Sequence, residues 1–375
     1  MHLRRLLLLV LLGAVPARAH SVSNELALGL NEDTPASPHG THVADQLTLR
    51  FDLNEDWTLK LGGAYTYDAE TPPPEGTAFG TSSAQILNAV AGVEWDASPR
   101  VNLYFDVQGS PRATQRFGSV FTITVNQGTD QITVPIDVQL SNSTSNVGLV
   151  AGASFTLGGK ELFGTVLGGT VLDVSIGWTL LSIEQRIDGI VDRNGNIVAR
   201  SALETYCRLF PNNWRCKALG PALKGGEDTL NEVSLSLAIL QPLGRTTELD
   251  LSGSVDFYDK DPATAGFFTY RAAQAATGSL GAGFPLAPVL FTVSPALQQQ
   301  VGAWTFAPWY QFIDYASGLG YAHVAGLRIS VRIGEAWTVW VSGSAQWDNL
   351  STDPSSNSTT LVISGRVALG FRARF

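Results

Sequence analysis

The residues that could carry chemistry are few and far apart in this chain of 375 residues. Beyond residue 19, the histidines are His20, His39, His42 and His323. A hydrolase needs its histidine base within hydrogen-bond reach of a nucleophile or an orienting carboxylate. No GxSxG motif or comparable set of residues accompanies these histidines. The sequence therefore predicts a protein that is not an enzyme.

One short stretch has the spacing of a calcium loop. DRNGN at 192–196 places oxygen donors at Asp192, Asn194 and Asn196. The same stretch also fits a tight hairpin turn at Asn194-Gly195, and we favour the turn because strand-like residues flank it on both sides. The two histidines of HGTH at 39–42 are equally weak evidence for a metal site. We expect no metal site and no cofactor.

The first residues predict where the chain acts. Residues 1–19, MHLRRLLLLVLLGAVPARA, combine arginines, an apolar run and an A-x-A site, as a cleaved secretory signal peptide does. The mature chain would begin at His20 and form one domain over 20–375. In an exported protein, Cys207 and Cys216 are expected to form a disulfide.

Charge and hydropathy exclude two classes of protein. Without Arg4, Arg5 and Arg18, the chain has 21 basic and 33 acidic residues, a net charge of −12. Nucleic-acid binding depends on neutralising phosphates and does not fit this balance. No later apolar run is long enough for a spanning helix. The mature protein is therefore either soluble or crosses a membrane as a closed barrel.

Alternation of apolar and polar residues is the dominant pattern. In QLTLRFDL at 46–53, Leu47, Leu49 and Phe51 share one face and Thr48 lies opposite. We predict a weak first strand at 22–30, then strands at 46–53, 57–67, 87–95, 101–108, 145–157, 170–182, 231–240, 246–257, 322–333, 336–347 and 360–375.

The connections alternate between short and long, as in outer-membrane barrels with short periplasmic turns and long extracellular loops. Short turns are expected at 54–56, 97–100, 158–161, 241–245 and 334–336, and long loops at 31–45, 68–84, 110–144, 184–230 and 348–359. Apolar-face aromatics gather at the strand ends, which predicts two membrane girdles. Their members are Trp57, Trp95, Trp337 and Phe375 at the short turns, and Tyr65, Tyr67, Phe257 and Trp347 at the long loops.

The chain ends on GRVALGFRARF at 365–375, an alternating strand whose last residue is Phe375. This terminus resembles the C-terminal signature of Gram-negative outer-membrane β-barrel proteins. The resemblance implies an outer-membrane location, contact with outer-membrane lipid and recognition by the barrel-assembly machinery, with Phe375 and Phe371 as the assembly signal. It also implies that the last strand closes the barrel against the first.

The strand number depends on residues 259–321. Five prolines, among them Pro295 and Pro308, disfavour central strands there. However, VLFTV at 289–293 and AWTFAPWYQF at 303–312 can pair around SPALQQQ. We favour an all-β, up-and-down antiparallel barrel of 14 strands, with 12 strands and an inward-folded plug as the alternative.

Charged residues in the register opposite the large apolar ones should line the pore. The basic set comes from the two ends of the chain and the acidic set from its middle, so we expect a basic and an acidic wall that face each other. Asp52 is an exception. The basic set is Arg50, Lys60, Arg328, Arg332, Arg366, Arg372 and Arg374; the acidic set is Glu94, Asp106, Asp173, Glu248, Asp250 and Asp256.

The leading functional hypothesis is a monomeric channel for passive diffusion of small polar solutes through a water-filled lumen. An alternative is a gated transporter of hydrophobic or aromatic molecules, similar to the fatty-acid and hydrocarbon transporters. Residues 20–45 leave no room for a large N-terminal hatch, but the Pro- and Ala-rich segment 262–300 could replace one. A third hypothesis is a structural or adhesive barrel that displays its loops. The sequence does not identify the solute.

Overall fold

The computed structural model describes residues 21–32, 40–70, 83–127, 130–162, 165–192, 194–212, 216, 223, 227–262, 289–318, 320–353 and 358–374. The predicted signal peptide, His39, most of the predicted plug region and Phe375 lie outside these residues. Within them, no helix is long and apolar enough to cross a membrane.

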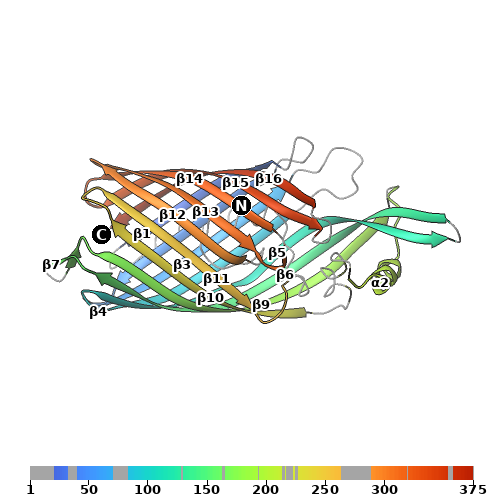
Figure 1. The fold of residues 1–375 in the computed structure, drawn as a ribbon, viewed down its shortest axis with the longest axis horizontal. Coiled ribbons are helices and arrows are strands. Elements are labelled where there is room, and N and C mark those ends of the chain that lie inside the picture. The colour runs from blue at the N-terminus through green and yellow to red at the C-terminus, as the bar shows by residue number, and fades with distance from the viewer. Residues whose placement is uncertain are drawn as a thin grey trace, which may run out of the picture.

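The described residues form a closed antiparallel barrel of 14 strands (Figure 1). Neighbours follow chain order, and β1 closes on β16 in a register that runs from Ser21 opposite Arg374 to Glu32 opposite Ile363. Closure pairs every strand on both sides, which a lipid environment requires because it offers backbone groups no water. The strands are β1 (Ser21–Glu32), β2 (Gly40–Asp52), β3 (Trp57–Glu70), β4 (Ser83–Ser98), β5 (Val101–Gln127), β6 (Asp130–Leu157), β9 (Thr170–Asp192), β10 (Glu227–Pro242), β11 (Thr247–Tyr258), β12 (Val289–Val301), β13 (Trp304–Tyr315), β14 (Gly320–Ile333), β15 (Trp337–Asp353) and β16 (Ser358–Arg374). The predicted fold is confirmed.

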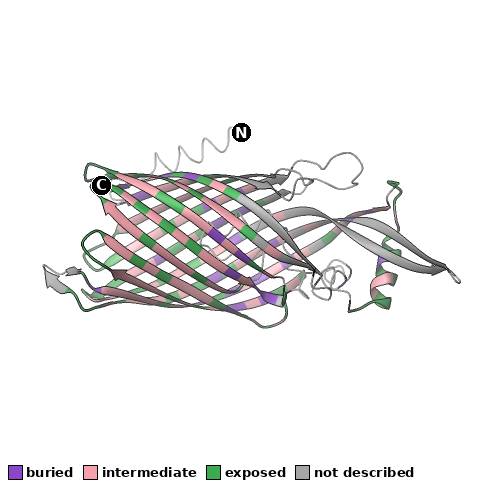
Figure 2. Ribbon diagram, turned by 45° about the horizontal axis from the view of Figure 1, so that its top comes forward, coloured by how far each residue is buried: buried purple, intermediate pink, exposed green. Residues whose placement is uncertain are grey.

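The predicted period of two appears as alternating burial along the strands (Figure 2). On β9, Val174, Ile176 and Trp178 are exposed on the outer surface, whereas the alternate residues Gly177 and Thr179 are buried. Exposed apolar side chains on every second residue give the barrel the outer surface that lipid needs.

The 14-strand prediction is confirmed because β12 and β13 form in the uncertain region. Their turn lies at Gly302, which has a φ of 63°, rather than around SPALQQQ, which belongs to β12. Pro308 lies inside β13, within the strand expected at 303–312, whereas Pro295 lies inside β12 and not in the expected turn. The β12–β13 pairing passes from Val293–Phe312 to Ala296–Trp309 and then to Gln299–Phe306, so each proline falls in a gap where its missing N–H is tolerated. Pro262 precedes the two strands, and the other two prolines lie outside the described residues.

The loop expected at 110–144 is instead a continuation of two strands. β5 and β6 pair without a long break from Val101–Phe155 to Gln127–Asp130. The flanking strands stop pairing earlier. The last β5 residue that pairs with β4 is Arg116, and the β6 residue nearest the tip that pairs with β9 is Ile136. The rest of the hairpin therefore projects past the barrel as a two-stranded arm (Figure 1).

The loop expected at 184–230 is shorter, because β9 extends to Asp192 and β10 begins at Glu227. It contains the helix α2 (Arg200–Leu209), whose Leu203 is fully buried against Val138 of β6 and Ile190 of β9. Cys207 and Cys216 form the predicted disulfide, with Cα atoms 5.3 Å apart.

DRNGN forms a turn, as favoured from the sequence, but with three residues between the paired Asp192 and Asn196. Gly195 has a φ of 78°, the conformation that a three-residue hairpin turn needs at this position. The Asp192 carboxylate accepts hydrogen bonds of 2.8 Å from the backbone N–H groups of Asn194 and Asn196 and from the Asn196 side chain.

Two short elements lie at the ends of the barrel. The turn expected at 158–161 is longer, since the hairpin β7 (Lys160–Leu162) and β8 (Thr165–Leu167) separates β6 from β9. At the opposite end, the 3-10 turn η1 (Ala316–Gly318) joins β13 to β14. We name the two ends the short-turn end and the long-loop end.

Candidate functional site: the interior of the barrel

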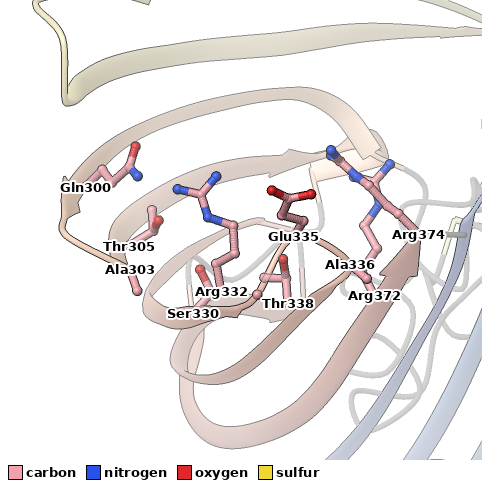
Figure 3. A pocket seen from close by; sticks show the side chains of 11 residues that line it. Gln300, Ala303, Thr305, Ser330, Arg332, Glu335, Ala336, Thr338, Arg372 and Arg374 are labelled. Carbon is pink, nitrogen blue, oxygen red and sulfur yellow. The ribbon is translucent and has the colours of Figure 1, made fainter.

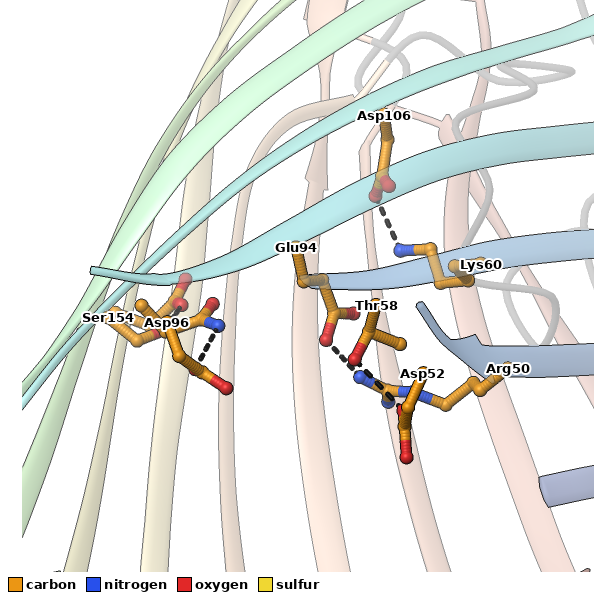
Figure 4. A network of polar contacts seen from close by, with 10 residues as sticks. Arg50, Asp52, Thr58, Lys60, Glu94, Asp96, Asp106 and Ser154 are labelled. Carbon is orange, nitrogen blue, oxygen red and sulfur yellow. Dashed lines mark hydrogen bonds and ion pairs between the residues drawn. The ribbon is translucent and has the colours of Figure 1, made fainter. Parts of the chain in front are cut away.

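Charged residues line the inner register near the short-turn end (Figure 4). Arg50 of β2 forms an ion pair with Glu94 of β4, and Lys60 of β3 pairs with Asp106 of β5 at 2.6 Å. Each pair bridges two strands that are separated by one strand in the barrel order. These contacts hold long basic side chains flat against the wall.

The ion pairs change the expected charge layout. The sequence analysis placed Arg50 and Lys60 on one wall and Glu94 and Asp106 on the facing wall, whereas the structure pairs them on nearby strands. Asp173 bonds to the hydroxyl groups of Ser154 and, at 2.8 Å, Tyr104. The charges of the two ion pairs are therefore neutralised locally, whereas Asp173 is held by hydroxyl donors, which do not neutralise it.

A second network crosses the seam where β1 meets β16. Glu25 of β1 accepts a hydrogen bond of 3.0 Å from Arg328 of β14 and one of 2.9 Å from the indole N–H of Trp340 of β15. The Arg328 guanidinium also lies 5.4 Å from the centre of the Trp340 ring. The register of Arg328 predicted its inner position, whereas Glu25 was not predicted because its strand has the weakest alternation.

Three inner aromatic side chains lie over glycines on the adjacent strand. Tyr104 covers Gly152, Trp309 covers Gly326 and Trp340 covers Gly370, and a Cβ on any of these glycines would overlap the ring. The glycines thus let large rings lie along the wall instead of projecting into the lumen. Sequence reasoning missed these rings because their register partners depend on the strand stagger.

The long-loop end of the interior has a different lining, which we call the outer collar. Its side chains occupy the inner register of five strands, β4, β9, β10, β13 and β14, are large or small apolar groups, and are each at most 7% exposed. They are Ile86, Leu181, Ile183, Leu230, Ile313, Tyr315, Ala322 and Val324. Two buried carboxylates lie in the inner register close to it, Glu232 on β10 beside Leu230 and Asp256 on the adjacent strand β11. The described interior is therefore packed at this end, where the apolar collar lies beside the buried polar side chains of Thr66, Asn88, Glu232 and Asp256.

A polar cavity of about 390 Å³ lies on the inner wall at the short-turn end (Figure 3). We call it the short-turn cavity. Arg332, Arg372 and Arg374 line it together with one acidic residue, Glu335. In the described part of the chain, none of the three guanidinium groups is paired with a carboxylate. Three of the predicted pore-lining residues thus converge on one site.

The remaining acidic candidates are more dispersed. Glu248 and Asp250 lie on β11 near the short-turn end, with Asp256 further along the same strand. Arg366 on β16 makes interactions within the chain. Whether the charged set lines a conducting path stays a prediction.

The outer face carries the predicted girdle residues. Trp57 and Trp95 are register partners whose rings stack 5.6 Å apart, and Trp337 lies 5.9 Å from Phe371. Tyr65 and Tyr67 lie on β3 towards the long-loop end, and Phe257 and Trp347 are exposed at that end.

An outer-face cluster on β13 and β14 was not expected. The Tyr310 hydroxyl lies 2.6 Å from Nδ1 of His323, and the Phe312 and Tyr321 rings pack around the same imidazole at 5.4 Å. His42 belongs to β2 rather than to the first loop. Of the two histidines in the described part of the chain, His42 and His323, the second lies in an aromatic environment on the outer face.

Comparisons with known proteins bear on the fold. No family model matches the chain, and a search of curated proteins finds no match. Among solved structures, the CymD monoaromatic hydrocarbon channel matches with a TM-score of 0.57 and 9% identity, over 96% of this chain and 89% of that chain.

Two further structures are similar. The Pseudomonas putida toluene transporter TodX matches with a TM-score of 0.54 and 8% identity, over 97% of this chain and 92% of that chain. A Pseudomonas aeruginosa FadL homologue matches with a TM-score of 0.51 and 10% identity, over 95% and 89%. At these identities the likeness establishes the fold: the chain is an outer-membrane-type β-barrel.

Proposed function

We propose that this protein is an outer-membrane channel that admits small apolar or aromatic molecules. The outer collar is the observation that carries this proposal. Long loops of outer-membrane barrels face the cell exterior. A molecule entering from outside would therefore meet the apolar collar before the charged wall and the short-turn cavity.

The collar discriminates between solutes by their hydration. A polar solute gives up hydrogen bonds to water when it enters an apolar passage, and each unreplaced bond costs about 1–3 kcal/mol. An aromatic molecule instead gains roughly 25 cal/mol for each Å² of apolar surface that it buries. This difference favours the hydrophobic alternative over a general channel for polar solutes.

The similar structures support the same choice by analogy of fold. Two of them are described as a monoaromatic hydrocarbon channel and a toluene transporter. The shared architecture also supports an outer-membrane location. Passage of hydrocarbons through this chain is our proposal, since the solute depends on side chains that differ at nearly all positions.

Uptake of labelled toluene by Gram-negative cells with an intact outer membrane tests the proposal. Expression of the protein should raise the initial uptake rate, and Leu230→Asp should lower it again by placing a charge in the collar. Ser236→Asp is the matched control, because Ser236 lies in the same register of β10 below the collar. Folded barrel in the membrane is quantified for each variant.

A different result would support the leading hypothesis from the sequence. One such result has two parts: expression in cells leaves toluene uptake unchanged, and the purified protein makes liposomes permeable to small sugars. The lumen would then be a passage for polar solutes. In that case the collar does not control entry, and our proposal is wrong.

A further inference from the structure

We propose that the short-turn cavity is a binding site for a small oxyanion, a carboxylate or a phosphate. This inference goes beyond the proposed passage of apolar molecules and does not depend on it. The cavity lies at the end of the barrel opposite the outer collar, within the short turns that join β12 to β13 and β14 to β15.

Charge is the first argument. Arg332, Arg372 and Arg374 outnumber the one carboxylate of the cavity, Glu335 (Figure 3). Like charges that share a partly enclosed space repel one another, because the surrounding protein screens them less than bulk water does. By contrast, Arg50 and Lys60 are neutralised by ion pairs with carboxylates of the chain. In the described part of the chain, no carboxylate forms an ion pair with the three arginines of the cavity. A bound anion would therefore neutralise their charge.

Geometry is the second argument. A guanidinium group offers paired N–H donors that match the two oxygens of a carboxylate or phosphate. Hydroxyl and amide groups of Thr305, Ser330 and Gln300 line the same cavity and can complete the hydrogen bonding. A volume of about 390 Å³ falls in the range of small-molecule sites.

The arginines come from two separate segments, β14 and β16, and the gap between these strands is filled by β15, whose Thr338 also lines the cavity. The barrel framework therefore fixes the backbone positions from which the three arginine side chains reach the cavity.

Calorimetric titration of the purified, folded full-length barrel with benzoate and with inorganic phosphate tests the site. We expect saturable binding of at least one anion at low salt, weakened by added salt. The double variant Arg332→Gln, Arg372→Gln should bind about tenfold or more weakly, because charge-assisted hydrogen bonds are lost. Glu335→Gln should bind more tightly, since it removes the only competing carboxylate of the cavity.

Arg245→Gln is the matched control, because Arg245 is exposed in the short turn after β10 and does not line the cavity. Binding of benzoate alone would assign the site to organic carboxylates, and binding of phosphate alone would assign it to phosphates. The proposal is overturned if neither anion binds, or if Arg245→Gln weakens binding as much as the double variant. Toluene uptake by the double variant reports on the channel separately.

Discussion

Single residues decide whether the wall ion pairs can form across an intervening strand. Gly92 of β4 lies between Lys60 and Asp106 in register, and a Cβ at this position would overlap the Asp106 carboxylate. We therefore expect Gly92→Ala to displace Asp106, break its pair with Lys60 and destabilise the barrel by about 1–3 kcal/mol, the usual cost of overpacking. Urea unfolding of the refolded barrel, followed by its gel mobility, measures the loss.

Gly63→Ala is the control for this substitution. A Cβ at Gly63 would have its nearest neighbour 3.8 Å away, at the Asn88 carbonyl oxygen, which is an ordinary contact. Both changes add the same methyl group to β3 or β4. If the two variants lose equal stability, the ion pair is not the cause.

Asp192 makes the turn at 192–196 sensitive to pH. Hydrogen bonds from the Asn196 side chain and from the backbone of Asn196 and Asn194 lower the pKa of this carboxyl group. Because the folded pKa lies below the unfolded value of about 3.9, the stabilisation is complete above that value and is lost as pH falls through the lowered one. The amide NMR signals of Asn194 and Asn196 should therefore shift at acid pH. In Asp192→Asn, which cannot titrate, they should not, and an identical pH course in both proteins would contradict this account.

At the scale of elements, the sequence predicted those strands well whose outer face contacts lipid. Lipid forces an apolar residue at every second position, and this alternation located the strands around 46–53, 101–108 and 336–347. Beyond the membrane no such force acts. The pattern fades after residue 108 although β5 continues to Gln127, so the projecting arm was predicted as a loop.

The interior was harder to predict than the strands. Register identified Arg50, Lys60, Glu94 and Asp106 as inner residues, but their pairing depends on the stagger between strands, which local sequence does not encode. The collar was missed for a related reason: Leu181 and Leu230 make the inner register apolar, so the alternation ends where the collar begins. Only the pairing of residues between neighbouring strands identifies the collar, and no local sequence pattern predicts that pairing.

The helix α2 depends on one buried side chain for its position. Leu203 is fully buried against Val138 and Ile190. We expect Leu203→Ala to cost about 2–5 kcal/mol of local stability through the cavity that it leaves. Limited proteolysis should then cut within 200–209 faster, while the barrel keeps its folded gel mobility.

Leu209→Ala in the same helix is the control, because Leu209 is 68% exposed and its truncation leaves no buried cavity. The disulfide is present in both variants. Equal protease sensitivity of the two variants would show that Leu203 does not anchor the helix to β6 and β9.

For the whole molecule, the interior has two zones in series: the apolar collar at the long-loop end, and the charged wall with the short-turn cavity at the other. Ions cross an apolar, dehydrated segment poorly. We therefore expect the refolded protein to show no steady ohmic steps in a planar bilayer under a KCl gradient. Replacing the register partners Leu181 and Leu230 with serine should hydrate the collar and produce measurable conductance.

Leu235→Ser with Ile176→Ser is the matched control, since these two residues are also register partners on β10 and β9 but lie exposed on the outer face. The control changes the same two strands without touching the interior, so it should remain non-conducting. Steady ohmic steps from the unmodified protein would mean that the collar does not block ions. The reversal potential would then show whether the basic or the acidic residues dominate selectivity, and the channel would be one for polar solutes.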